Sequence, residues 1–217
     1  MRLATNFWGW AMIFQTKKAR ANIIKVLFES GLIVFSVLLA LFLNEMHSQV
    51  KKDQERVRAL QLIKAELTAN KVLLEQWQPY HREILKRVEL AISSPSLSVE
   101  ITEQRNFILT LMPNGLVQEM LRNAAWDALK QSGISSNMQI ETISSLAALY
   151  NLQAVSIEAT LFRLSDIFYT RESVGKGNLE ETLYLMRNLL QELIAQEQFM
   201  IEIYEEGITD ISEQLNR

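Results

Sequence analysis

One uncharged run constrains this chain more than any other feature. From Ser30 to Leu43 the sequence contains no charged residue and is almost entirely apolar. At ~1.5 Å per residue the run is about 21 Å long as a helix, shorter than the ~30 Å hydrocarbon core of a bilayer. Extension towards the N-terminus reaches spanning length and takes in Lys25 and Glu29, which can pair on one helix face. We therefore expect a single transmembrane helix over residues 23–43.

Other interpretations of this run remain open from the sequence. A cleaved signal peptide has an apolar core of only ~7–15 residues, although the leader here is long and no small-x-small cleavage site follows Leu41. A buried helix of a soluble protein would also be apolar. Lys25 and Glu29 either reach towards the lipid headgroups at the membrane interface, or form a functional charge pair inside the membrane that matches a partner helix.

The residues ahead of the run predict its surroundings and its direction. Residues 1–22 form a basic, aromatic-rich leader, in which Trp8 and Trp10 suit the membrane interface, and a disordered tail is the alternative. Of the 22 basic and 25 acidic residues of the chain, five basic and no acidic ones precede Glu29. A basic leader before the first span usually stays in the cytoplasm, although Lys and Arg near the two ends of the span tie in number. We expect a bacterial inner-membrane protein with a cytoplasmic N-terminus and a periplasmic C-terminal domain.

Behind the run, the helical pattern continues. The 7 Gly and 3 Pro residues are too few for the many turns of a β-protein. Residues 44–92 contain no Gly and a single proline, Pro79. Apolar residues recur there at the spacing of a coiled coil or bundle helix, at positions Val50, Val57, Leu60, Ile63, Leu67, Leu74, Trp77 and Ile84. We expect a stalk helix over residues 44–92, continuous with the span, which Pro79 kinks or divides.

The remaining residues, 93–217, predict the other helices of a bundle. A loop rich in Ser and Pro opens this part, and Gly133 is a candidate C-cap. Helices are expected over residues 102–111, 116–131, 139–169 and 178–215. The predicted fold class is all-α, with one N-terminal transmembrane helix continuous with a long stalk helix, followed by an antiparallel helical bundle.

A series of short motifs runs from the end of the apolar run to the middle of the chain. It comprises Leu41-Phe-Leu-Asn44, Glu66-Leu67, Asn70, Ala124-Ala125-Trp126, Leu129, Ser132-Gly133 and Tyr150. This series resembles an uncharacterised family of bacterial single-pass membrane proteins, whose span ends in Leu-x-x-Asn-x-Trp and whose next helix carries Glu-Leu-x-x-Asn. Met46 stands where that family has Trp. The resemblance covers residues 29–150 and implies a membrane-attached helical domain of unknown function, with no activity assigned.

Composition and motifs exclude several kinds of site. The chain has no Cys, which excludes disulfides and thiolate ligands. The acidic excess behind the leader argues against nucleic-acid binding. No HExxH, Walker-loop, GxGxxG or GxSxG motif occurs. The histidines His47 and His81 lie about 160° apart around a continuous helix, so they cannot share a metal ion within it. We predict no catalytic residue, no cofactor and no metal.

A few polar and aromatic residues are candidates for contacts. Asn44 ends the apolar run. Asn70 interrupts an apolar stripe, where a polar side chain fixes register or partner number, or makes a local hydrogen bond in the bundle. Trp126 fits a core residue, with an exposed contact as the alternative. His81 continues another apolar stripe and is either a packed histidine or a pH sensor.

Together these features favour a structural or protein-interaction component of the bacterial envelope, without catalysis. Its partners would be the lipid bilayer and either a second copy of the chain or another envelope protein. The alternative is a periplasmic sensor domain that binds a small ligand between helices and signals through the stalk to a separate partner. An enzyme is the least favoured class, because it would require a deep polar pocket.

Overall fold

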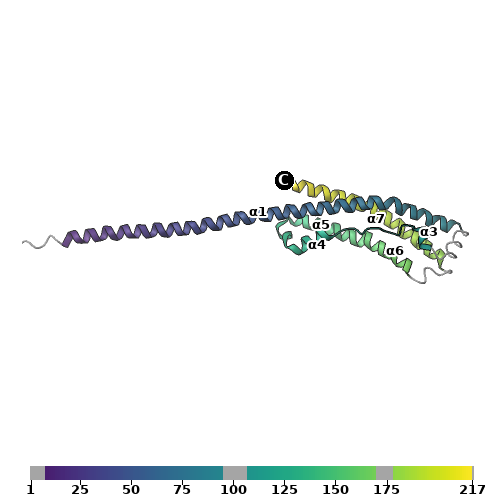
Figure 1. The fold of residues 1–217 in the computed structure, drawn as a ribbon, viewed down its shortest axis with the longest axis horizontal. Coiled ribbons are helices and arrows are strands. Elements are labelled where there is room, and N and C mark those ends of the chain that lie inside the picture. Colours follow the sequence, from purple (N-terminus) through teal and green to yellow (C-terminus); the bar gives the residue numbers. More distant parts are fainter. Residues whose placement is uncertain (1–7, 95–106, 170–177, 217) are drawn as a thin grey trace, which may run out of the picture. The chain divides into compact units, whose positions relative to one another are not determined.

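In the computed structural model, residues 8–94, 107–169 and 178–216 are described, and all of their regular secondary structure is helical (Figure 1). The predicted all-α class is thus confirmed. The α-helices are α1 (Trp8–Ser93), α3 (Phe107–Leu111), α4 (Ala124–Ser132), α5 (Ile140–Gln153), α6 (Ala159–Tyr169) and α7 (Leu179–Leu215). A 3-10 turn, η1 (Ile134–Asn137), follows α4, and a π-helical turn, η2 (Ala154–Glu158), joins α5 to α6.

The chain divides into two units, Met1–Asp53 and Gln54–Arg217. In the first unit, the large apolar side chains between Leu27 and Leu43 are exposed, and the most apolar window of α1 is 0 % buried. This exposure differs from that of a core helix in a soluble protein, which would be mostly buried. One helix of the described residues is therefore long and apolar enough to cross a membrane. Lys25 and Glu29 pair as expected, with Nζ and Oε1 3.8 Å apart.

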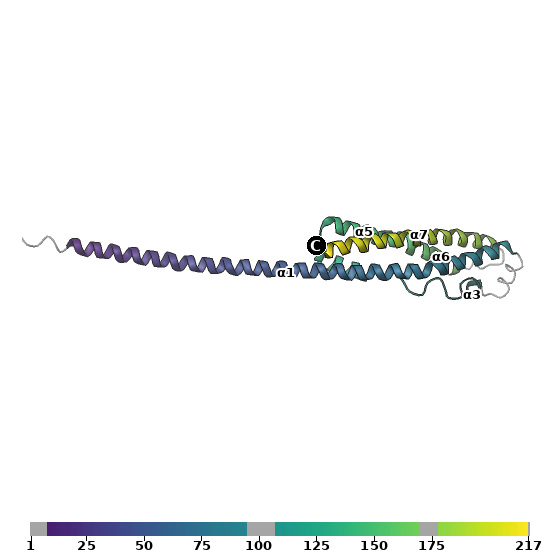
Figure 2. The same ribbon diagram turned by 90° about the horizontal axis from the view of Figure 1, so that it is seen from above.

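In the second unit, α7 lies beside α1 and runs antiparallel to it (Figures 1 and 2). The Lys71 ammonium of α1 pairs with Glu205 of α7. Further along α1, the Gln78 amide donates to Gln198, which comes earlier in α7. The order of these pairs fixes the opposite directions of the two helices.

The helical stretch α5–η2–α6 runs parallel to α1 and antiparallel to α7. The Tyr150 hydroxyl of α5 donates to Glu66 of α1. One turn further along both helices, Asn70 Nδ2 of α1 donates to Gln153 Oε1 of α5. Against α7, the Tyr204 hydroxyl donates to the same Gln153 oxygen. The bundle thus consists of the Gln54–Ser93 part of α1, the α5–α6 stretch and α7, with α4 at one end.

The apolar stripe read from the sequence forms the core of this bundle. Six of its members, Leu60, Ile63, Leu67, Leu74, Trp77 and Ile84, are buried, whereas Val57 is half-buried and Val50, in the first unit, is exposed. Positions three and four apart share one face of an α-helix, so a single stripe of α1 faces its neighbours along the whole bundle. Pro79 does not divide the helix, because α1 is continuous across it.

One expected helix is described only in part, and another is wrong in its first half. Within the predicted 102–111 helix, the described part is α3, Phe107–Leu111, and residues 102–106 lie outside the described residues. The predicted 116–131 helix is wrong in its first half, because residues 112–123 contain no helix and α4 begins only at Ala124. We refer to residues 112–123 as the strap. Gly133 does end α4, in a left-handed conformation at φ 72°.

Candidate functional site

The strap lies along α1, and side chains of α1 bind its backbone. Within the strap, Tyr80 contacts Asn114 and Gly115, His81 contacts Leu116, and Asn70 contacts Arg122. Just before the strap, Arg87 donates to the Leu111 carbonyl. Just after it, Glu66 accepts from Ala125 and Trp126. The partners move back along α1 as the strap advances, so the strap is antiparallel to α1. A segment without helical bonds needs other partners for its buried backbone groups, and α1 supplies them.

Glu66 caps α4 from a different helix. Its Oε2 accepts from the Ala125 N–H at 2.8 Å, and its Oε1 lies 3.4 Å from the Trp126 nitrogen. These are the positions that an N-cap side chain would serve, and the local N-cap, Asn123, makes no such bond. The negative carboxylate also meets the positive end of the helix dipole, which is worth about 0.3–2 kcal/mol. Glu66 therefore fixes where α4 begins.

Asn70 binds the strap through both polar atoms of its amide. Its Nδ2 donates to the Arg122 carbonyl at 2.7 Å, and its Oδ1 accepts from the Arg122 N–H at 2.8 Å. The same Nδ2 lies 3.3 Å from Gln153 Oε1. The side chain is 0 % exposed, so water cannot replace these bonds without a rearrangement. Asn70 thus fixes the position of the strap along α1.

Gln153 connects this cluster to α7 and to the π-helical turn. Its Oε1 accepts from the Tyr204 hydroxyl at 2.8 Å, and its Nε2 donates to Glu158 at 2.7 Å. Gln153 and Glu158 are five residues apart, the spacing of a π-helical turn, and η2 lies between them. The irregular turn allows both side chains to meet although an α-helix would place them on different faces.

Tyr150 and Trp126 form the apolar side of the Glu66 cluster. Their rings stack with centroids 5.4 Å apart and an interplanar angle of 4°. Burial, followed by the hydrogen bond to Glu66, raises the pKa of Tyr150 far above its ordinary value. Burial, with the charge of Glu158 next in size, likewise raises the pKa of Tyr204. Both hydroxyls therefore stay protonated and act as donors in the network.

A second buried cluster joins α1, α7 and the strap through His81. Its Nδ1 lies 2.5 Å from Glu197 Oε1, and its Nε2 lies 2.8 Å from the Leu116 carbonyl oxygen. Both side chains are 0 % exposed. Glu197 Oε2 is buried and has no partner among the described residues. Burial is the largest effect on this carboxyl and raises its pKa, opposed by His81 and Arg82.

The residues predicted from the sequence are distributed unequally between these clusters. Asn70 and Trp126 both belong to the Glu66 cluster, and Trp126 is a buried core residue as expected. Asn44 is exposed in the first unit. The backbones of Trp8 and Trp10 are helical, but their side chains lie outside the described residues.

Several members of the clusters, among them Glu66, Gln153 and Glu197, were not predicted as site residues. Glu66 was noted only as part of a motif, and its spacing of four from Asn70 placed both on one face of α1. Gln153 and Glu197 carry no sequence signal, because each is one of many polar residues on an amphipathic helix. The bonds that link them to other helices reach Tyr204, 51 residues from Gln153, and His81, 116 residues from Glu197.

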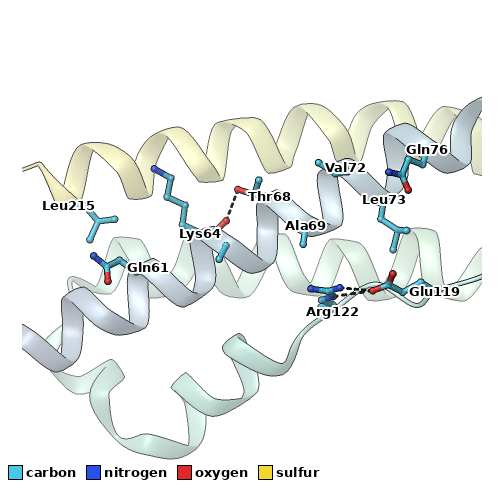
Figure 3. Close-up of a pocket in the computed structure, with 11 residues that line it drawn as sticks. Gln61, Lys64, Thr68, Ala69, Val72, Leu73, Gln76, Glu119, Arg122 and Leu215 are labelled. Atoms are coloured by element: carbon cyan, nitrogen blue, oxygen red, sulfur yellow. Dashed lines mark hydrogen bonds and ion pairs between the residues drawn. The ribbon is translucent and has the colours of Figure 1, made fainter.

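One open groove lies on α1 outside these clusters (Figure 3). It has a volume of about 770 Å³, with Ala65, Ala69 and Val72 of α1 along it, Leu215 of α7 at one end and Glu119 and Arg122 of the strap on one side. Glu119 and Arg122 pair with each other at 2.6 Å. The groove exposes a mainly apolar surface beside the strap.

Comparison with known proteins gives no relative for this chain: no family model, no curated protein and no solved structure matches it. Within the described residues, no group of three or more His, Asp or Glu side chains could hold a metal ion. What the described polar clusters do is hold backbone: they cap α4, fix the strap and link α1 to α7.

Proposed function

We propose that this chain is a single-pass inner-membrane protein whose helical bundle acts as a structural or protein-interaction component of the bacterial envelope, without catalysis. The observation that carries the proposal is the exposed apolar surface of α1 between Leu27 and Leu43. Soluble proteins rarely expose so large a continuous apolar surface, since each Å² in water is unfavourable by roughly 25 cal/mol. A bilayer removes that surface from water.

The bundle supports an interaction role rather than a catalytic one. Its buried polar side chains bind backbone groups and one another: Glu66 caps a helix, Asn70 holds the strap and Gln153 links two helices. A catalytic site needs polar groups directed at a substrate position. Among the described residues, the buried side chains of Glu66, Asn70 and Gln153 are engaged in holding the fold.

Orientation is the first part to test. A reporter that is active only in the periplasm, fused after Arg217, should be active if the N-terminus is cytoplasmic. An inactive fusion, together with activity of a second reporter that works only in the cytoplasm, would reverse the proposed topology. Intact-mass measurement on the membrane-extracted protein separates an anchor from a cleaved signal peptide, because cleavage would remove the leader and the span.

Interaction is tested by photo-crosslinking in intact membranes. A photoreactive residue at Phe162 or Phe199, which are large, apolar and exposed on α6 and α7, should capture a second copy or another envelope protein. The same residue at the exposed polar position Glu89 serves as the control. A chain that remains monomeric and uncrosslinked from every bundle position would contradict the interaction role.

A sensor domain is the second candidate, and the groove on α1 is the observation in its favour. Its volume of about 770 Å³ falls within the range of ligand pockets. A thermal-shift screen of small molecules on the full chain should then find a stabilising ligand. Val72→Trp, which fills the groove, should abolish that shift, and a screen without any hit would remove this candidate.

A further inference from the structure

The His81–Glu197 pair contains one proton whose position can be deduced from its partners. The Leu116 carbonyl can only accept, so the nitrogen that contacts it, Nε2, carries a hydrogen. The contact between Nδ1 and Glu197 Oε1, at 2.5 Å, then needs one further proton between the two atoms. With that proton the pair is neutral overall, whether it is written as acid and imidazole or as carboxylate and imidazolium.

The second carboxyl oxygen of Glu197, which has no partner among the described residues, decides between the two forms. A buried carboxylate with one oxygen unbonded is far less stable than a buried neutral acid, because desolvation penalises charge. Burial raises the pKa of Glu197 in agreement with this. With the strap in place, Glu197 is therefore a carboxylic acid that donates its O–H to Nδ1 of a neutral His81 imidazole. The Nε2–H of His81 donates to the Leu116 carbonyl of the strap.

Loss of this proton would put the two bonds of His81 in conflict. The imidazole then has a single hydrogen, and a carboxylate is a stronger acceptor than a backbone carbonyl. The stable arrangement places the hydrogen on Nδ1, where it binds the Glu197 carboxylate. Nε2 then presents a lone pair to the Leu116 carbonyl oxygen across a 2.8 Å contact, which is repulsive.

We propose that the His81–Glu197 pair is a proton-operated latch: it holds the strap on α1 while it carries one shared proton, and it releases the strap at Leu116 when that proton leaves to solvent. Release is a change of imidazole tautomer, from hydrogen on Nε2 to hydrogen on Nδ1. It would uncover the buried apolar side chains of the strap, Met112 and Leu121.

The groups around the pair bear on which proton controls the contact between His81 and Leu116. Among the described residues, the titratable or charged groups that act on Glu197 are His81 and Arg82, both on α1. The rings of Trp77 and Tyr80 flank His81, with centroids 6.0 and 6.1 Å from its ring. Tyr80 holds the strap one residue away, with its hydroxyl donating to the Gly115 carbonyl. On α7, the neighbours Gln196 and Gln198 are amides without a titrating proton.

The direction of the pH effect follows from proton counts. The folded pair keeps its proton, whereas in an unfolded chain a free carboxyl and a free imidazole have both lost theirs above about pH 6.5. Above that pH the folded state binds one proton more than the unfolded state, so the contribution of the pair weakens as pH rises, by at most about 1.4 kcal/mol per pH unit. Release of the strap also gives up one proton to solvent, so the opening equilibrium of the strap rises by at most tenfold per pH unit.

The test is hydrogen exchange of the strap in the full-length protein in lipid nanodiscs between pH 6 and 9, normalised to the intrinsic exchange rate. In the wild type, protection of residues 112–123 should fall by up to tenfold per pH unit, while the α1 segment around Leu60 stays protected. Glu197→Gln replaces the acid by an amide that donates to Nδ1 without titrating, so protection of the strap should no longer depend on pH. Glu202→Gln, the same change at an exposed position of α7, should follow the wild type.

A second readout needs no substitution. In protein labelled with ¹⁵N-histidine, the His81 ring signals should change from an Nε2–H to an Nδ1–H tautomer over the same pH range, and His47 provides an internal reference. A wild-type strap whose protection does not change with pH, a Glu197→Gln strap that opens together with the wild type, or a His81 ring that keeps hydrogen on Nε2 throughout would each overturn the latch.

Discussion

Replacement of Asn70 by alanine should lower the free energy of unfolding of the bundle by about 2–4 kcal/mol. The substitution removes three hydrogen bonds: two to the Arg122 backbone, at 2.7 and 2.8 Å, and one to Gln153 at 3.3 Å. Each is worth ~0.5–1.5 kcal/mol net, and more where the remaining partner is buried and unbonded. Asn70 is 0 % exposed, so its bonds are shielded from water. Arg122 is an exposed residue, so water can reach part of its backbone after the substitution. The expected loss of stability therefore lies in the middle of the range.

A second substitution at the same position tests the reasoning about donors and acceptors. In Asn70→Asp the shape is conserved, and one oxygen still accepts from the Arg122 N–H. The other oxygen faces two acceptors, the Arg122 carbonyl and Gln153 Oε1, where the wild type has a donor. At neutral pH the loss should therefore be at least as large as in Asn70→Ala. Acidification that protonates the new carboxyl restores a donor and should recover part of the stability.

The assay is urea unfolding of the full chain in detergent micelles, followed by tryptophan fluorescence, to which the buried Trp77 and Trp126 contribute. Free-energy differences come from the midpoints and slopes of the transitions. Thr68→Ala is the matched control, since Thr68 is exposed on α1 and bonds only within its own helix, and it should change stability by less than ~0.5 kcal/mol. If Asn70→Ala is as mild as this control, the strap is not held by Asn70.

Three further perturbations have expected outcomes. Glu66→Gln removes the charge at the N-terminus of α4 but keeps an acceptor, so unfolding experiments should show a loss of about 1–2 kcal/mol, and a wild-type midpoint would contradict the capping role. Gly207→Ala places a Cβ 2.9 Å from Leu149 Cδ1 and 3.3 Å from Leu67 Cδ1, so the core must shift and stability should fall by ~1 kcal/mol despite the better helix propensity of alanine; a stabilised variant would show that the contact is loose. Leu38→Lys puts a charge into the apolar run and should make membrane insertion less favourable by ~2.5–3.5 kcal/mol. The membrane-bound fraction after carbonate extraction should therefore fall. Full retention would argue against a span there.

The Glu66 cluster brings together residues that belong to separate short motifs of the sequence. Glu66, Asn70, Trp126 and Tyr150 are separated by up to 84 residues, yet all four lie in one hydrogen-bonded and stacked cluster. Each of them has a geometric requirement that few other side chains meet, such as the two-point amide of Asn70. These four residues belong to the longer series of motifs that resembles an uncharacterised membrane family, and that resemblance stays a prediction.

Local pattern was sufficient for most of the helices and for the apolar run exposed on α1, because helical periodicity and lack of charge are properties of consecutive residues. The sequence alone therefore predicted the all-α class, the buried stripe of α1, the C-cap at Gly133 and the pairing of Lys25 with Glu29. Local pattern failed at the strap. Residues 116–123 include several good helix formers, so they read as helix, whereas their backbone is bound by α1 side chains from 35 to 52 residues away.

Only the tertiary structure could decide which polar residues matter. His81 and Glu197 are 116 residues apart, so their pairing leaves no local signal. The sequence marked His81 only as a member of an apolar stripe, and nothing near Glu197 distinguishes it from other polar residues on a helix face. Their significance arises because packing removes both from water and leaves one proton and one backbone carbonyl to satisfy them. The sequence determined where most of the described helices form and which part of α1 is apolar enough to cross a membrane. The folded bundle determined that the strap would be held by Asn70, Tyr80 and His81, since hydrogen bonds between distant residues exist only after the chain has packed.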